Sequence, residues 1–265
     1  MNKISFLILT FFFLLAFSSC TVNRAKVNND LKKYFDSAHV DGSFSFLNNQ
    51  LGDITVYNMK LDTERLSPGT SFKILNTLIG LQTGKITNEN TLIKTDSASN
   101  KNITLKEAFN TSSIPYFQSL VRQIGKDTMK FWVDSISYGN KKISGPVDSF
   151  WLNNTLKISP DEQLGLMSKI YFEQLPFQKY AQQIVESLML KEDNTLYKLS
   201  YTTGTGIDDK SNSFGWALGW IEENRHVYFF VTFIKTPDKK LDLNETGIHI
   251  SKSILKEMGF FKGEK

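Results

Sequence analysis

The 265-residue chain is poor in the residue types that build metal and redox sites. It has one cysteine, Cys20, so no internal disulfide can form. Its three histidines, His39, His226 and His249, are scattered without the spacing of metal ligands, and we expect no metal. The formal net charge is only +4, and no cluster of lysine and arginine is interleaved with aromatic residues. We therefore expect no nucleic-acid partner.

The chain also lacks repeats and low-complexity segments, and its N-terminal apolar run, residues 4–17, is too short to favour a stable membrane span. Lys3 places a positive charge before this run, and Ser18-Ser19 places small residues after it. This pattern is typical of an export signal. We predict a signal peptide over residues 1–19.

Cys20 directly follows the predicted signal peptide. The segment Phe17-Ser18-Ser19-Cys20 resembles a bacterial lipobox, in which the cysteine becomes the lipidated N-terminus of the exported protein. This resemblance implies a membrane anchor at Cys20, and Thr21 after it is compatible with sorting to the outer membrane, facing the periplasm. The alternative is an ordinary signal peptide with a chance cysteine.

The remaining chain divides into a tether with a first helix, residues 20–40, and one domain, residues 41–265. Apolar residues make up 40% of the sequence, enough for a sizeable core. Apolar periodicity predicts strands at 42–47, 53–58, 196–203, 213–222 and 226–234, with a tight turn at Glu223-Asn224. It predicts helices at 30–38, 70–83, 105–110, 115–124, 126–135, 162–170 and 247–258. This order indicates an α+β fold, with an antiparallel sheet from both ends of the domain, flanking helices and a helical middle.

The most informative segment is Thr70-Ser71-Phe72-Lys73, which follows Pro68-Gly69. The helix it begins is apolar on most of its circumference, so we expect it to be buried, with Thr70 at its N-terminus among free backbone N–H groups. Lys73 lies three residues after Thr70, so both face one side of the helix. Burial lowers a lysine pKa by roughly 3–5 units, which provides a neutral amine.

Five segments in order resemble class D β-lactamases, the oxacillinases of the penicillin-recognising fold. The resemblance covers about residues 41–259. The matching segments are Phe72-Lys73-Ile74 with Asn76, Ser112-Ser113-Ile114-Pro115 (family Ser-x-Val-Pro), Tyr138-Gly139-Asn140, Phe150-Trp151-Leu152 and Thr202-Thr203-Gly204 (family Lys-Thr-Gly). The resemblance implies the serine β-lactamase and transpeptidase fold for residues 41–265.

The resemblance also implies a site for β-lactam hydrolysis through an acyl-enzyme. Its nucleophile would be Thr70, and its base would be Lys73, carbamylated by carbon dioxide. Ser112 would relay protons, and Trp151 would donate a hydrogen bond to the carbamate. The backbone N–H groups of Thr70 and Thr205 would bind the oxyanion. No other cofactor is implied.

Substrate-binding groups are implied at Ile114 and at Thr202-Thr203-Gly204, for a β-lactam or a peptidoglycan-like small molecule. The oligomeric state stays open. Three of the matched segments also have structural interpretations. Ser112 can cap the helix near Pro115, Tyr138-Gly139-Asn140 can be a turn, and Trp151 can be a core residue.

Three positions depart from the family pattern. Thr70 replaces the serine nucleophile, and its methyl group restricts χ1 and crowds the attack path. Thr202 replaces the lysine of Lys-Thr-Gly, and Gly247 stands where the family carries an arginine that pairs with the substrate carboxylate. Losing both cations should weaken binding of an anionic β-lactam by about an order of magnitude or more, unless Lys198 or Lys252 supplies the charge.

These departures leave three hypotheses for function. The first is a class D β-lactamase-like hydrolase that uses Thr70 and has weak activity. The second is a binding or sensor module that holds a β-lactam or peptidoglycan-like ligand without turnover. The third is a structural lipoprotein of the cell envelope. Enzymatic activity therefore stays open at this stage.

Overall fold

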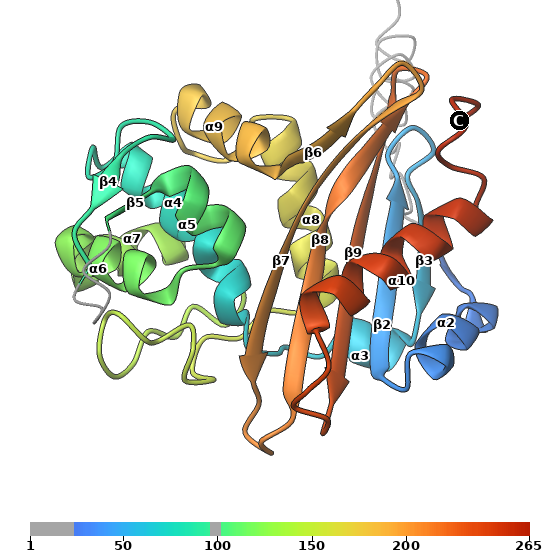
Figure 1. Ribbon diagram of the computed structural model, residues 1–265, viewed down its shortest axis with the longest axis horizontal. Coiled ribbons are helices and arrows are strands. Elements are labelled where there is room, and N and C mark those ends of the chain that lie inside the picture. Colours follow the sequence, from blue (N-terminus) through green and yellow to red (C-terminus); the bar gives the residue numbers. More distant parts are fainter. Residues whose placement is uncertain (1–23, 96–101) are drawn as a thin grey trace, which may run out of the picture.

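The computed structural model describes residues 24–95 and 102–265 (Figure 1). Its strands are β1 (Arg24–Val27), β2 (Asp41–Asn48), β3 (Asp53–Tyr57), β4 (Leu92–Ile93), β5 (Ile103–Thr104), β6 (Leu190–Asp193), β7 (Tyr197–Ile207), β8 (Ser213–Glu223) and β9 (His226–Thr236). Its α-helices are α2 (Lys32–Ser37), α3 (Met59–Asp62), α4 (Lys73–Gln82), α5 (Leu105–Thr111), α6 (Ile114–Ile124), α7 (Lys126–Ser135), α8 (Pro160–Tyr171), α9 (Lys179–Met189) and α10 (Leu243–Glu257). The short 3-10 helices η2 (Asn29–Leu31) and η3 (Gly69–Phe72) precede α2 and α4. The predicted signal peptide and Cys20 lie outside the described residues.

A central sheet has the strand order β1-β3-β2-β9-β8-β7-β6. Helices α4 to α7 gather beyond the β7–β6 side of this sheet (Figure 1). The predicted α+β fold with a helical middle is therefore confirmed. Within the described ranges, 24–95 and 102–265, no helix is both long and apolar enough to cross a membrane.

Both faces of the sheet are covered by helices. Helix α10 packs on one face against β8 and β9, and α8 packs on the other against β9 and β2. Along β9, Phe229 and Phe233 belong to the core shared with the helical middle, whereas Phe230 and Ile234 belong to the core under α10. Successive side chains of a strand point to opposite faces. The nearly continuous apolar runs in the last strands therefore reflect burial on both sides.

One strand was missed, because residues 24–27 were expected to be tether. They form β1, which pairs in parallel with β3, from Arg24 opposite Asp53 to Val27 opposite Val56. The sheet is therefore mixed rather than purely antiparallel. Ala25, Lys26 and Val27 are exposed, so this edge strand is held by backbone pairing and leaves no alternating apolar pattern.

Two element boundaries also differ from the prediction. The turn between β8 and β9 is formed by Asn224 and Arg225, with φ of 47° and 66°, rather than by Glu223-Asn224. Two central residues with positive φ are what a type I′ hairpin turn requires. Helix α10 begins at Leu243, four residues earlier than predicted. The Asp242 carboxylate caps it by accepting the backbone N–H groups of Asn244 and Glu245.

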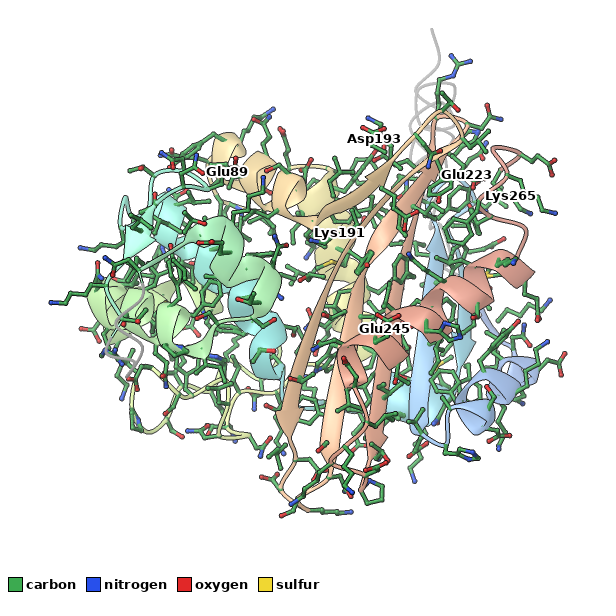
Figure 2. The ribbon with its side chains drawn as sticks, in the orientation of Figure 1. Glu89, Lys191, Asp193, Glu223, Glu245 and Lys265 are labelled. Carbon is green, nitrogen blue, oxygen red and sulfur yellow. The ribbon has the colours of Figure 1, made fainter. Side chains whose placement is uncertain are left out.

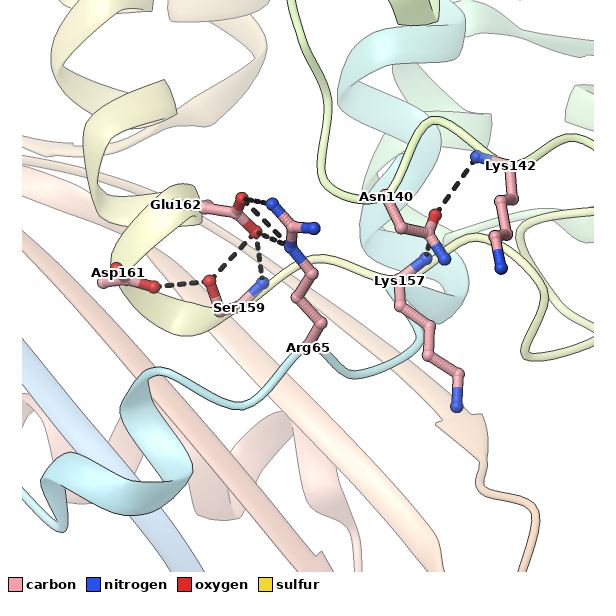
Figure 3. A network of polar contacts seen from close by, with 7 residues as sticks. All are labelled: Arg65, Asn140, Lys142, Lys157, Ser159, Asp161 and Glu162. Carbon is pink, nitrogen blue, oxygen red and sulfur yellow. Dashed lines mark hydrogen bonds and ion pairs between the residues drawn. The ribbon is translucent and has the colours of Figure 1, made fainter.

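The segment Tyr138-Gly139-Asn140 is a turn with a fixed partner. Gly139 has a φ of +49°, and a Cβ atom there would lie 1.9 Å from the carbonyl oxygen of Lys157. The side-chain oxygen of Asn140 accepts the backbone N–H groups of Lys157 at 3.0 Å and Lys142 at 3.2 Å (Figure 3). The glycine and the asparagine are therefore explained by the backbone they hold together.

The segment that leads to the predicted nucleophile is attached to α8. Arg65 Nε donates to both carboxylate oxygens of Glu162, each at 3.1 Å (Figure 3). Glu162 also accepts the backbone N–H of Ser159 at 3.0 Å, as part of the capping box of α8, and it accepts the Ser159 hydroxyl at 2.9 Å. Leu66 forms an isolated bridge with Ile158. These contacts fix the position at which the chain enters η3.

Candidate active site

The predicted nucleophile helix is present and buried, although its first turn is the 3-10 helix η3 and α4 begins at Lys73. Strand β7 lies directly against η3. A Cβ atom at Gly204 would lie 2.2 Å from the backbone nitrogen of Ser71, so only glycine permits this approach. The close contact brings the middle of β7 to the side of Thr70.

Lys73 is buried, as its sequence context predicts, with 2% of its surface exposed. Its Nζ donates to Ser112 Oγ at 2.6 Å and lies 5.0 Å from the centre of the Phe109 ring. Burial, and then the positive charge of Lys191, lower the pKa of Lys73 to about 7. At neutral pH roughly half of these amines are therefore neutral and able to accept a proton.

Ser112 holds its hydroxyl at Lys73 by an unusual backbone conformation. It ends α5 with a φ of 51°, in the left-handed region that serine rarely adopts. The residue that precedes α6 is Ser113, so the alternative that Ser112 caps that helix is wrong. The strained conformation and the hydrogen bond to Lys73 both fit the relay position.

Thr70 Oγ1 accepts the backbone N–H of Thr205 at 2.8 Å. This N–H is one of the two donors that the resemblance implies for the oxyanion. Among the described residues, no hydrogen bond joins Thr70 to Lys73, whose amine donates to Ser112. The threonine hydroxyl therefore rests at an oxyanion donor rather than at the base.

The neighbouring hydroxyl cannot take the place of Thr70. Ser71 is 1% exposed, and its Oγ donates to the carbonyl oxygen of Pro68 at 2.7 Å. Its side chain points into the interior, toward Gln163 Nε2 at 3.5 Å. Thr70 is therefore the nucleophile candidate of this segment.

Trp151 is a core residue that stacks on Phe72, with ring centres 5.7 Å apart. The Lys73 amine, neutral in about half of the molecules near pH 7, is the form of lysine that can take up carbon dioxide. Within residues 24–95 and 102–265, no group of three or more His, Cys, Asp and Glu is placed to hold a metal ion.

A groove of about 340 Å³ opens beside Lys73. Its described lining residues come from α4, α5, β6, β7 and the start of α10: Lys73, Phe109, Asn110, Lys191, Tyr201, Thr202, Thr203, Asp242, Asn244, Glu245 and Ile248. The volume is that of a small-molecule site. Thr202 and Thr203 line the groove, in agreement with their predicted position.

Other predicted site residues are not among those that line this groove, and these include Thr70, Ser112, Gly204 and Thr205. Ile114 starts α6 and is 39% exposed, away from the groove lining. Gly247 faces the sheet, where a Cβ atom would lie 3.6 Å from Ala217 Cβ. Lys198 pairs with Asp193 on β6 and Lys252 with Glu192, and neither lines the groove.

Lys191 is a second lysine that lines the groove beside Lys73, and the sequence patterns did not predict it. It belongs to no recognisable motif and stands just after α9, at the start of β6. The sequence carried no signal for it, because its distance from Lys73 along the chain says nothing of their proximity in space.

Comparison with known proteins identifies the family. The model of the penicillin binding protein transpeptidase domain matches residues 25–258. "Probable beta-lactamase YbxI" of Bacillus subtilis is 36% identical over 244 residues, which cover 90% of this chain and 87% of that protein. The class D β-lactamase FUS-1 (OXA-85) of Fusobacterium nucleatum has 30% identity and a TM-score of 0.83, over 89% of this chain and 100% of that structure. The C-terminal domain of the Bacillus licheniformis BlaR penicillin-receptor has 28% identity and a TM-score of 0.83, over 90% and 98%.

The chain therefore belongs to the penicillin-binding transpeptidase family, as a class D β-lactamase-like protein. Hydrolysis of β-lactams is the reaction of this family. The family inferred from the five sequence segments is confirmed.

Proposed function

We propose that the groove binds β-lactams and that Thr70 accepts the acyl group, with Lys73 as the base and with slow turnover. The observation that carries this proposal is the buried Lys73 amine, which has a pKa of about 7 and donates a hydrogen bond to Ser112. Lys73 lies three residues after Thr70 in the chain. A base with a pKa near the working pH combines availability with proton affinity.

In the proposed reaction, the neutral Lys73 amine takes the proton of the Thr70 hydroxyl. The Thr70 oxygen then attacks the β-lactam carbonyl carbon, and the backbone N–H groups of Thr70 and Thr205 bind the developing oxyanion. The ring C–N bond breaks, and the proton passes through Ser112 to the leaving nitrogen. Water then hydrolyses the ester and releases Thr70. A carbamate on Lys73 would supply a carboxylate-like base for that water.

The geometry also explains why turnover is expected to be slow. The Thr70 hydroxyl occupies the Thr205 N–H, which the oxyanion needs, and must leave it to reach Lys73. A β-branched side chain has fewer favourable χ1 rotamers than serine, so this rotation is restricted. Acylation is the step affected, since the free Thr70 hydroxyl is present only before the ester forms.

Intact-protein mass spectrometry with benzylpenicillin, with bicarbonate added, tests the proposal alongside a chromogenic cephalosporin turnover assay. We expect a slowly formed adduct of one penicillin mass, mapped by peptide digestion to Thr70, and turnover that is slow but measurable. An adduct on another residue, or neither an adduct nor a thermal shift, would contradict the proposal and leave the structural cell-envelope role.

A second candidate is a β-lactam or peptidoglycan-ligand sensor that acylates without turnover. The similarity to the BlaR penicillin-receptor domain favours it. The same experiment separates the two, because a sensor gives a stable adduct on Thr70 and no chromogenic turnover.

We further propose that residues 1–19 are a signal peptide and that Cys20 is lipidated, which would hold the protein at the outer membrane, facing the periplasm. Metabolic labelling with an alkyne fatty acid is expected to tag the wild-type protein and not the Cys20→Ser variant. No labelling of the wild type would favour the ordinary signal peptide, and equal labelling of both would place the lipid on another residue.

A further inference from the structure

Lys191 stands at an irregularity in the sheet. On the neighbouring strand β7, Ser200 pairs with Leu190 and Leu199 pairs with Glu192, so Lys191 between them is the extra residue of a bulge. A bulge re-aims a side chain, and bulges are frequent next to active sites. Here the bulged residue lines the groove with Lys73 and Thr202.

The Lys191 ammonium is positioned by uncharged groups. Its Nζ donates to Asn110 Oδ1 at 2.8 Å and to the carbonyl oxygen of Leu188 at 3.1 Å. An ammonium has three N–H donors, so one is left for a ligand. Within the described residues no carboxylate pairs with Lys191, in contrast to Lys198 and Lys252.

The opposite side of the groove carries negative charge. Asp242 and Glu245 line it from the beginning of α10, whereas Lys191 lines it from β6. Lys191 and Glu245 are labelled in Figure 2. A ligand carboxylate is repelled near these two acidic residues and attracted to Lys191. The distribution of charge thus gives the groove one end suited to an anion.

We propose that Lys191 binds the carboxylate of the acylating ligand, and so provides from β6 the positive charge that Thr202 does not provide from β7. This inference rests on the proposed function and deepens it, because it assigns the ligand class as an anionic β-lactam whose carboxylate lies toward β6. Lys191 determines specificity for the charge of the ligand and takes no part in bond making.

The test compares Lys191→Met with Lys198→Met, an exposed lysine on the adjacent strand. Acylation by benzylpenicillin and by its neutral methyl ester is followed by intact mass at pH 7.5, because burial and Lys106 lower the pKa of Lys191 and a higher pH would reduce the charge under test. Any effect of Lys191 on the Lys73 amine is common to both ligands and cancels in their ratio. Removal of a charge-assisted hydrogen bond predicts that the acid-to-ester rate ratio falls about tenfold or more in Lys191→Met. The ratio is expected to stay unchanged in Lys198→Met.

Hydrolysed benzylpenicillin, which cannot acylate, provides a reading that does not depend on Thr70. Its binding, titrated by NMR, is expected to weaken about tenfold in Lys191→Met and to recover in Lys191→Met with Thr202→Lys, which places a lysine at another position of the same groove lining, on β7. If this pattern holds without any acylation, the proposed acyl transfer is wrong and the role of Lys191 stands. An unchanged acid-to-ester ratio where acylation occurs, no binding of hydrolysed benzylpenicillin by the wild type, or equal binding by Lys191→Met overturns the inference.

Discussion

Thr70→Ser is expected to raise the rate of acylation by benzylpenicillin about a hundredfold, the scale of penalty for a reacting group held in a misplaced position. In the wild-type site the Thr70 hydroxyl rests on the Thr205 N–H, at 2.8 Å, and does not contact Lys73. Serine has no γ-methyl group, so its hydroxyl turns to the base more freely and leaves the oxyanion donor open. Intact-mass kinetics on wild type and variant measure the change.

Two neighbouring substitutions are the controls for this result. Thr70→Val keeps the branched shape without the hydroxyl and is expected to form no adduct. Ser71→Ala removes the adjacent hydroxyl, which is committed to Pro68, and is expected to acylate at the wild-type rate if the fold is retained. If Thr70→Ser acylates no faster than the wild type, the methyl group is not what limits the site.

Lys73→Met is expected to lower the acylation rate about 10²–10⁴-fold, the usual contribution of a general base. Methionine has a similar length and fits the buried site next to Phe109, but it cannot accept the proton of Thr70. Wild-type acylation is expected to rise with pH as Lys73 loses its proton, with a midpoint near its pKa of about 7. A pH profile of the acylation rate and the rate of the variant at pH 8 measure both effects.

Lys73→Met is expected to lower the acylation rate but to raise the stability of the folded protein. The pKa of Lys73 is about 7 in the native state and near the ordinary value of 10.4 in the unfolded chain. Between these values the unfolded state binds more protons, so the cost of the buried amine is complete below pH 7 and disappears as the pH approaches 10.4. Lys73→Met should therefore raise the free energy of unfolding by about 2–4 kcal/mol at pH 6 and by less at pH 9, in denaturant titrations. An equal gain at both pH values, or full acylation activity, would contradict the role assigned to this lysine.

Much of the fold was predictable because its elements carry strong local patterns. Residues 213–222 and 226–234 are apolar and aromatic, and they form the centre of the sheet as β8 and β9. Residues 24–27 form a strand in which Ala25, Lys26 and Val27 are exposed, so no alternation of buried residues marks it in the sequence. The β8–β9 turn lies one residue later than predicted, because Arg225 adopts a positive φ that is unusual for arginine.

The site was predictable to the extent that it follows a family pattern. Burial of Lys73 and its proximity to Ser112 agree with the prediction. The proposed compensation by Lys198 or Lys252 is wrong for the groove, since both are paired with carboxylates outside it. A lysine's distance from a cavity depends on strand pairing and bulges, which single-sequence patterns do not encode.

The sequence by itself determined the family, the α+β class and the identity of the altered groups, because residue types at fixed spacings report chemistry directly. The tertiary structure decided which hydrogen bond Thr70 makes, where Gly247 points and which lysine lines the groove. These depend on side-chain rotamers and on contacts between segments such as β6, β7 and η3, which are distant in sequence and meet only when the core packs.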